Sequence, residues 1–397
     1  MDISIPAGFQ WSALHCGIKQ DASVDDYVLV RCLPETVAAG VYTRNRVFAA
    51  PVAWDRSRTP AADIRAVVVN SGNANACTGD QGWQDVQAMA SSAAEACDAV
   101  ADQVLVMSTG IIGEFLPMQK ILPAAGQAEK TLGDDEAAFM TAARGILTTD
   151  QGPKVASRTV EIAGQAVHLA GMAKGAGMIG PNMATMLAMV MTDAALEPAD
   201  AQAALSQAIE RSFNCISVEG HTSTNDTVLL LASGASGGSP LAGAALEEFS
   251  CALESVCVDL AKQIPADGEG ASHLITIDVQ GAASVEDARQ IAQTIANSNL
   301  VKAGVAGADP NWGRIISAVG YAGVEIDPDR VRVAMNGFDL YQAGSPVPFD
   351  VAEVSASIAG SPETSIVVAI ESGEAAARFW TSDLTADYVR FNSEFHT

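Results

Sequence analysis

The feature that most constrains the fold is a series of short apolar runs without polar alternation, separated by alanine-rich segments. Consecutive apolar positions indicate strands that are covered on both faces. The runs predict strands over 27–33, 65–70, 103–109, 226–232, 273–279 and 364–372. The segments between them predict helices over 81–101, 134–146, 198–212, 241–264 and 285–298, the last opened by Ser284 three residues before an acid. The chain is therefore expected to be α/β, with helices layered over mixed sheet.

The length of the chain indicates more than one hydrophobic core. Its 397 residues exceed the size at which a single core usually stops growing. We therefore expect two domains, or one domain with a large lobe. After the helix over 285–298 the predicted strands become shorter and turns more frequent. A soft boundary is placed near residue 283, with 284–397 as the C-terminal lobe.

The charge balance limits the partners. The chain has 22 Lys and Arg against 47 Asp and Glu, a net charge of −25. Such a charge disfavours nucleic acids and anionic membrane surfaces as partners. It also means that an anionic substrate needs a locally placed cation. No apolar run approaches the ~18 residues of a membrane span. The N-terminal MDISIPAGFQ lacks the basic and apolar regions of a signal peptide, so a cytoplasmic protein is expected.

Cysteine and histidine spacing gives no metal signature. The seven cysteines are scattered and form no CxxC, which is typical of reduced, mostly buried thiols. The five histidines show neither HxxxH nor HExxH spacing. We expect no metal site.

A glycine-rich segment, KGAGMIGPNMATMLAMVMTDA (174–194), allows two interpretations. Residues 175–180 fit the G-x-G-x-x-G pattern of dinucleotide binding. Against this, Pro181-Asn182 forms a turn, the run after it is as good a buried strand as a helix, and no strand ending in an acid follows. Nucleotide binding is kept as an alternative.

The second interpretation centres on Thr185. A threonine here is often a core residue whose hydroxyl bonds to the backbone. A hydroxyl that follows a small residue, Ala184, after a turn able to hold strained backbone can also attack its own preceding carbonyl. An N→O acyl shift and hydrolysis would free Thr185 as a new N-terminus. Its α-amine, with an ordinary pKa of about 7.7–8.0, can take the proton of the same residue's hydroxyl.

Several motifs carry a family resemblance. They are PAGF (6–9), NSGNANACTG (70–79), STGIIG (108–113), LTTD (147–150), AKGAGMIGPNMATML (173–187), STNDTVLLLA (223–232), DGEGA (267–271) and GADPNWGRI (307–315), with Asn392 and Thr397 at the end. In this order they resemble the ornithine acetyltransferases, which include the bifunctional glutamate N-acetyltransferases of arginine biosynthesis. The match runs nearly end to end, and its longest motifs are too long to agree by chance.

The resemblance implies a four-layer αββα sandwich with mixed sheets and a smaller C-terminal α/β lobe. It implies self-cleavage between Ala184 and Thr185 into chains 1–184 and 185–397, which assemble as two of each or more. Acetyl would pass from N-acetyl-L-ornithine to the Thr185 hydroxyl and then to L-glutamate. No cofactor is implied, and whether acetyl-CoA also donates acetyl is left open.

Roles for individual residues also follow from the resemblance. Thr109 and Gly110 would form the oxyanion hole, although on their own they read as a strand-ending turn. Lys174 would bind a carboxylate and Glu269 an ammonium group, although DGEGA alone reads as a polar loop. The remaining substrate-binding residues would be Thr148 (or its neighbour Thr149), Thr185, Asn392 and Thr397. Because chain ends usually fray, the last two require a docked C-terminus.

One position departs from the family, and one alternative activity is kept. The family has an apolar residue where Glu114 stands; facing the site it would oppose oxyanion stabilisation, and we expect it to point to solvent. The alternative activity is a self-cleaved amidase or aminopeptidase in which water replaces glutamate.

Overall fold

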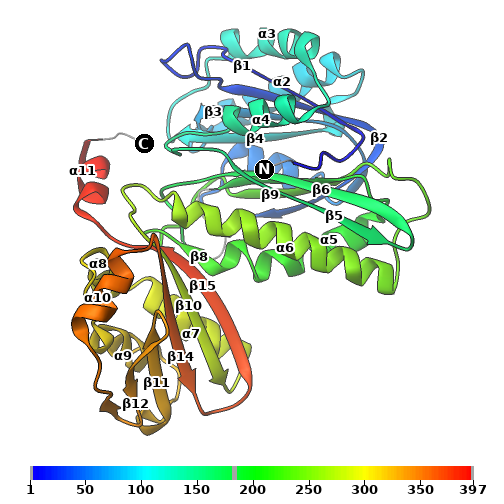
Figure 1. Cartoon of the computed structure of the whole chain (residues 1–397). Coiled ribbons are helices and arrows are strands. Elements are labelled where there is room, and N and C mark those ends of the chain that lie inside the picture. Colours follow the sequence, from blue (N-terminus) through cyan, green and yellow to red (C-terminus); the bar gives the residue numbers. More distant parts are fainter. Residues whose placement is uncertain (1–2, 181–185, 395–397) are drawn as a thin grey trace.

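The computed structural model describes residues 3–180 and 186–394 (Figure 1). The predicted cleavage site, Ala184 and Thr185, lies outside the described residues, and so does Thr397. All the strands and helices that the sequence predicts are confirmed. Their ends differ by up to about five residues, except that the strand predicted over 27–33 continues to Tyr42. None of the helices in the described part of the chain is long and apolar enough to cross a membrane.

The first sheet has eight strands in the order β4-β3-β2-β9-β7-β6-β5, with β1 paired to β2. The pairs β3/β4 and β7/β9 are parallel and the others antiparallel, so the sheet is mixed. The strands are β1 (Phe9–Leu14), β2 (Tyr27–Tyr42), β3 (Ala61–Asn73), β4 (Val104–Ile111), β5 (Lys154–Ile162), β6 (Gln165–Lys174), β7 (Leu187–Thr192) and β9 (Thr227–Ala232).

This sheet folds over on itself. The pairing of β2 with β3 shifts register between Arg31 and Thr36, where Glu35 has a positive φ of 65°. Such an irregularity bends a strand and increases its twist. One core therefore contains side chains from both halves of the sheet, such as Leu105 and Met107 of β4 with Met189 of β7. The two β layers of the expected sandwich are halves of one continuous sheet.

Helices cover the two outer faces of the folded sheet (Figure 1). On one side α2 (Gly79–Ala96) packs on β3 and β4, and α3 (Met118–Ala128) packs on α2, β1 and β2. On the other side α5 (Pro198–Glu210) packs on β2 and β9, and α6 (Ala244–Ala266) packs on β5 and β6. Alternate residues of one strand enter different cores, as Val106 and Met107 do. This explains why the strands read as continuous apolar runs. Two further helices are α1 (Ala50–Arg56) and α4 (Glu136–Gly145).

The second sheet has seven strands in the order β13-β12-β11-β14-β10-β15-β8. They are β8 (Ile216–Ser217), β10 (Leu274–Ala282), β11 (Val331–Met335), β12 (Phe338–Gln342), β13 (Ser345–Pro346), β14 (Glu363–Ile370) and β15 (Ala375–Ser382). The boundary expected near residue 283 falls at the end of β10. Because β8 and β10 also belong to this sheet, the sheet includes residues that precede the expected lobe 284–397.

The second sheet and the helices that pack on it form the second body of the molecule, and the first sheet with its helices forms the first body. The helices of the second body come after β10 in the chain. They are α7 (Val285–Ala296), α8 (Asn299–Ala306), α9 (Trp312–Gly320) and α10 (Val351–Ala359). The side chain of Ser284 caps α7 by accepting a hydrogen bond from the Asp287 N–H at 3.1 Å, as the sequence predicts. After β15 the chain leaves this body, and the described residues end with α11 (Ala386–Glu394), beside the first body (Figure 1).

Candidate active site

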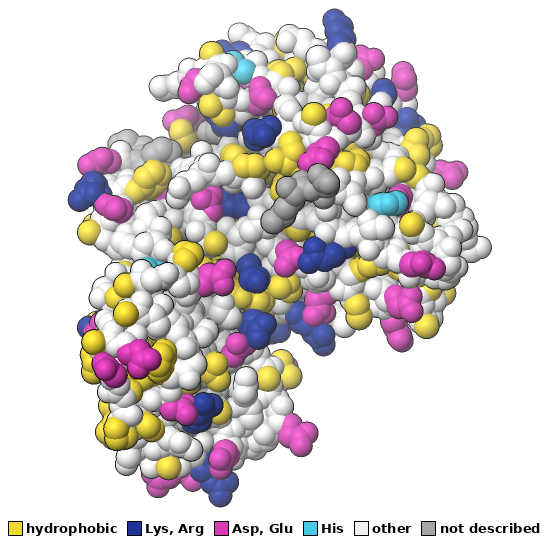
Figure 2. Space-filling model, viewed as in Figure 1, with side chains coloured by type: hydrophobic (Ala, Val, Ile, Leu, Met, Phe, Trp, Pro, Cys, Tyr) yellow, Lys and Arg dark blue, Asp and Glu magenta, His cyan; other side chains and the backbone are white. Residues whose placement is uncertain are grey.

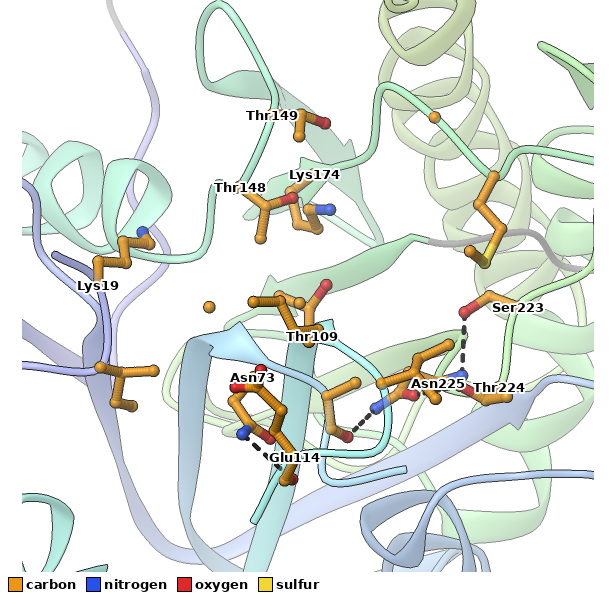
Figure 3. Close-up of a pocket in the computed structure, with 18 of the residues that line it drawn as sticks. Lys19, Asn73, Thr109, Glu114, Thr148, Thr149, Lys174, Ser223, Thr224 and Asn225 are labelled. Carbon is orange, nitrogen blue, oxygen red and sulfur yellow. Dashed lines mark hydrogen bonds between the residues drawn. The ribbon is translucent and has the colours of Figure 1, made fainter. Parts of the chain in front are cut away.

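A cavity of about 730 Å³ opens where β3 and β4 end. Every predicted site residue that the structure describes lines it: Thr109, Gly110, Thr148, Lys174, Glu269 and Asn392. Figure 3 shows the side chains of Thr109, Thr148 and Lys174 directed into the cavity. These residues come from segments far apart in the sequence, so the fold is what brings them together.

One side of the cavity is built by two glycines. Gly110 has a φ of +134°, and a Cβ at this position would lie 2.2 Å from the carbonyl carbon of Gly72. Gly72 is also in the positive region, at +108°. Only glycine adopts such conformations without strain. The close approach of the two backbones fixes the Gly110 N–H next to the buried hydroxyl residue Thr109.

Asn225 joins three of the sequence motifs around this corner. Its Nδ2 donates to the carbonyl oxygens of Ala74, at 2.6 Å, and Ser108, at 2.8 Å. Its Oδ1 accepts a hydrogen bond from Thr224 Oγ1 at 2.7 Å. Segments 70–79, 108–113 and 223–232 are thereby held in one buried network. Sequence reasoning identified these motifs but assigned no role to Asn225, because a side chain that joins loops has no characteristic spacing.

Lys174 is a buried cation on the other side of the cavity. Its Nζ lies 3.7 Å from Asp150 Oδ2, while Lys154 Nζ lies 2.6 Å from the other oxygen of Asp150. Burial alone would raise the pKa of Asp150, but the two ammonium groups lower it. Burial lowers the pKa of Lys174, and Asp150 opposes that change. At 3.7 Å the Lys174 pair is an ion pair without a hydrogen bond, which leaves Nζ donors for a substrate carboxylate.

Glu269 is held by hydrogen bonds at both carboxylate oxygens. Thr149 Oγ1 donates to one at 2.7 Å and Asn392 Nδ2 to the other at 3.1 Å. A Cβ on Gly177 would lie 2.4 Å from Glu269 Cδ, so a larger residue there would displace the carboxylate. Thr148 and Thr149 both line the cavity, and it is the Thr149 hydroxyl that bonds to Glu269.

The C-terminal helix is docked, as a functional terminus requires. Thr385 Oγ1 donates to the Gly270 carbonyl at 2.6 Å, immediately before α11. A Cβ on Gly270 would lie 2.3 Å from the Tyr388 nitrogen, so α11 starts in direct contact with the segment that carries Glu269. This contact delivers Asn392 to the cavity.

Lys19 is a cavity residue that the sequence did not single out. The four backbone N–H groups of residues 16–19 donate to the Asp26 carboxylate at 2.6–3.1 Å, which shapes the loop. The Lys19 side chain lies beside Gly72. Burial lowers its pKa to about 8; Asp26 opposes this, and the Lys174 charge adds to it. The signal available in the sequence was only that basic residues are few.

The charge of the cavity is opposite to that of the chain. Three lysines, Lys19, Lys120 and Lys174, line it with two glutamates, Glu114 and Glu269. Acidic side chains are spread widely over the visible face of the molecule, in keeping with a net charge of −25 (Figure 2). Such a local excess of cations favours an anionic ligand.

Glu114 is exposed at the mouth of the cavity. Its carbonyl oxygen accepts a hydrogen bond from Asn73 Nδ2 at 3.2 Å (Figure 3). Glu114 is exposed, but it also lines the cavity, so the expectation that it points to solvent rather than to the site stays a prediction.

The glycine-rich segment does not have the geometry of a dinucleotide-binding turn. It follows β6, and the next element is the antiparallel partner β7, with Lys174 paired to Leu187. A dinucleotide fingerprint requires a helix that begins at the glycines. The nucleotide-binding alternative is therefore wrong.

Comparison with known proteins identifies the family. Residues 10–397 match the ArgJ family. The arginine biosynthesis bifunctional protein ArgJ of Rhodopirellula baltica is 46% identical over 396 residues, covering 99% of this chain and 96% of the relative. That of Symbiobacterium thermophilum is 45% identical over 398 residues, covering 100% and 98%. The crystal structure of the Bacillus halodurans ArgJ protein, 39% identical with a TM-score of 0.51, covers 52% of this chain and 98% of that chain. The chain therefore belongs to the ArgJ family and is an ornithine acetyltransferase, an N-acyltransferase of arginine biosynthesis.

Proposed function

We propose that this enzyme moves an acetyl group from N-acetyl-L-ornithine to L-glutamate through an ester on Thr185. The observation that carries the proposal is the convergence on one cavity of all the described residues assigned to the oxyanion and the substrate. The Thr185 hydroxyl attacks the acetyl carbonyl, ornithine leaves as the amine, and the α-amine of glutamate then attacks the ester. The α-amine of Thr185, freed by cleavage after Ala184, accepts the hydroxyl proton.

Both steps pass through a tetrahedral oxyanion. The Thr109 hydroxyl and the Gly110 N–H are the donors proposed for it. Losing one such donor typically lowers the rate by ~10²–10³. The contact between Gly110 and Gly72 supports this role, because it fixes a backbone donor before the substrate arrives.

Lys174 and Glu269 are the proposed partners of the two charged ends of the substrate. Ornithine and glutamate share an α-carboxylate, which a cation with free donors can hold in both half-reactions. The ammonium of the ornithine side chain then fits the carboxylate of Glu269, between Thr149 and Asn392. Thr148 and Thr397 are proposed to complete the substrate pocket.

The proposal includes two chains, 1–184 and 185–397, assembled as at least two of each, in the cytoplasm. The Bacillus halodurans chain supports the division, because 98% of it is covered by 52% of this chain. Seven free cysteines are in keeping with a reducing compartment.

Intact-mass analysis with N-terminal sequencing tests the cleavage. Two fragments are expected from the wild type, the second starting TMLAMV, and Thr185→Ala should stay whole and inactive. An intact, fully active wild-type chain would contradict the proposal.

An ornithine-release assay tests the reaction. Glutamate should raise release from acetylornithine well above the water background. Release that ignores glutamate would favour the amidase alternative. The same assay with acetyl-CoA in place of acetylornithine shows whether that donor is also used.

A further inference from the structure

A buried carboxyl group next to the cleavage segment has no role in the function described above. Asp226 precedes β9 and its side chain is completely buried. Its Oδ1 accepts a hydrogen bond from the Met186 N–H at 3.2 Å. Its Oδ2 has no hydrogen-bond partner among the described residues. The nearby Thr43 hydroxyl is not available, because it donates to the Ser223 carbonyl at 2.7 Å. An unpaired buried oxygen costs stability, so it calls for an explanation.

The position of this carboxyl suggests the explanation. Met186 is held on both sides, since its carbonyl oxygen also accepts a hydrogen bond from the Thr227 N–H at 3.2 Å. The Met186 nitrogen is covalently bonded to the carbonyl carbon of Thr185. Only the Thr185 α-carbon separates that carbonyl from the Thr185 nitrogen, which is the nitrogen of the bond to be cut. Asp226 therefore binds the N–H of the residue that directly follows Thr185 in the chain, one peptide bond beyond the bond to be cut.

Burial favours the acid form of this carboxyl at neutral pH. Burial raises the pKa of Asp226 to about 8. The hydrogen bond from the Met186 N–H and the Lys174 charge oppose that rise in part. Lys174, on β6, is the charged group that acts on it, and Lys174 itself faces Asp150, Lys154 and Glu269.

We propose that Asp226 transfers the proton during self-cleavage between Ala184 and Thr185, an inference that rests on the proposed function. As Thr185 Oγ bonds to the Ala184 carbonyl carbon and the C–N bond breaks, the acid proton of Asp226 passes to the leaving nitrogen. The proton that the hydroxyl loses returns to the carboxylate. The products are the Ala184 ester of Thr185 and a free α-amine, with Asp226 unchanged. Water then hydrolyses the ester.

The chain offers a matched control in Asp55. It is also completely buried, its Oδ1 accepts a backbone hydrogen bond from Val106 N–H at 2.7 Å, and its Oδ2 likewise has no partner among the described residues. Burial also raises its pKa. Asp55 lies in α1, and it does not line the cavity. Asp55→Asn therefore reproduces the structural cost of losing a buried acid without touching the cleavage segment.

The test is the rate of cleavage of freshly translated full-length chain, followed by intact mass. Asp226→Asn should cleave roughly 10²-fold more slowly than the wild type, as expected for loss of a proton donor. Asp226→Glu should recover part of the rate, and Asp55→Asn should cleave like the wild type. The ratio of wild-type to Asp226→Asn rates should fall as the pH rises past about 8, where the acid form is lost.

Two outcomes overturn the role of Asp226: a folded Asp226→Asn that cleaves at the wild-type rate, or a deficit that is the same at every pH. If circular dichroism shows that Asp226→Asn does not fold, the role of Asp226 is tested instead by the pH dependence of the wild-type cleavage rate. A rate that levels off or falls above pH of about 8 supports the proposal, and a steady rise overturns it. A wild-type chain that never cleaves contradicts the proposed function itself, so the two failures are distinguishable.

Discussion

The two sides of the cavity are built in different ways. The glycine wall consists of Gly72 and Gly110 with Asn225, and backbone contacts fix its geometry. The charged wall consists of Lys174 and Glu269 with Asn392, and side chains from three separate segments form it. A group that stabilises a transition state must be placed in advance, whereas groups that hold two different amino acids need some freedom. We therefore expect substitutions in the glycine wall to abolish most of the activity, and substitutions in the charged wall to lower it by smaller, graded amounts.

The largest effect should come from Gly110→Ala. A methyl group would lie 2.2 Å from the Gly72 carbonyl carbon at a φ of +134°. The strands must separate to accept it, so both cleavage and acetyl transfer should fall by more than ~10³-fold, the upper range for losing an oxyanion donor. Gly113→Ala is the control, because Gly113 also has a positive φ, +86°, but no atom within 4 Å of its added Cβ. Equal losses in both variants would mean that backbone strain, not contact with Gly72, sets the geometry.

The second largest effect is expected from Thr109→Ala. Because its hydroxyl contact strengthens only as charge develops on the oxygen, kcat should fall by ~10²–10³ with little change in KM. Thr109→Ser keeps the hydroxyl and should recover much of the rate. Steady-state kinetics on cleaved enzyme measures both. A sharp rise in KM at constant kcat would move Thr109 from the oxyanion hole to substrate binding.

Lys174→Met should show the graded behaviour of the charged wall. Losing a charge-assisted hydrogen bond of about 1.5–3 kcal/mol should lower kcat/KM about ten- to a hundredfold for both acetylornithine and glutamate. Lys154→Met is the control, since Lys154 pairs with the same Asp150 but does not line the cavity. If Lys154→Met has the same effect, Lys174 acts through Asp150; if only one substrate suffers, Lys174 does not hold the shared carboxylate.

The smallest effect is expected from pH and Lys19. Its pKa is lowered to about 8, so the charged form, which attracts anions, is lost as the pH rises through that value. The KM for glutamate should therefore rise a few-fold above that pH, as expected for one exposed or partly exposed charge. Lys19→Arg should remove the rise, and Lys19→Met should show the higher KM at all pH values. A wild-type KM that does not change with pH would exclude Lys19 from glutamate binding.

The charged wall was easier to predict than the glycine wall. The family resemblance assigned Lys174, Glu269 and Asn392, and all three line the cavity, whereas it assigned only Gly110 of the glycine wall. The fold class was also predictable, because continuous apolar runs require strands covered on both faces. The bend of β2 was not, since it depends on an irregularity around Glu35 that no periodicity marks. Asn225 and Asp226 were missed for a similar reason: their roles come from contacts with residues that are distant in sequence.

The order of the first sheet gives the proposed cleavage a mechanical consequence. Strands β9 and β7 belong to 185–397, and they lie between β2 and β6, which belong to 1–184. A cut after residue 184 would therefore leave two interleaved chains, with two strands of 185–397 inserted between the strands of 1–184. Separating them would break the β2/β9 and β6/β7 ladders together and expose the core between the layers. The fragments should behave as one cooperative unit on unfolding, and neither should fold when it is expressed alone.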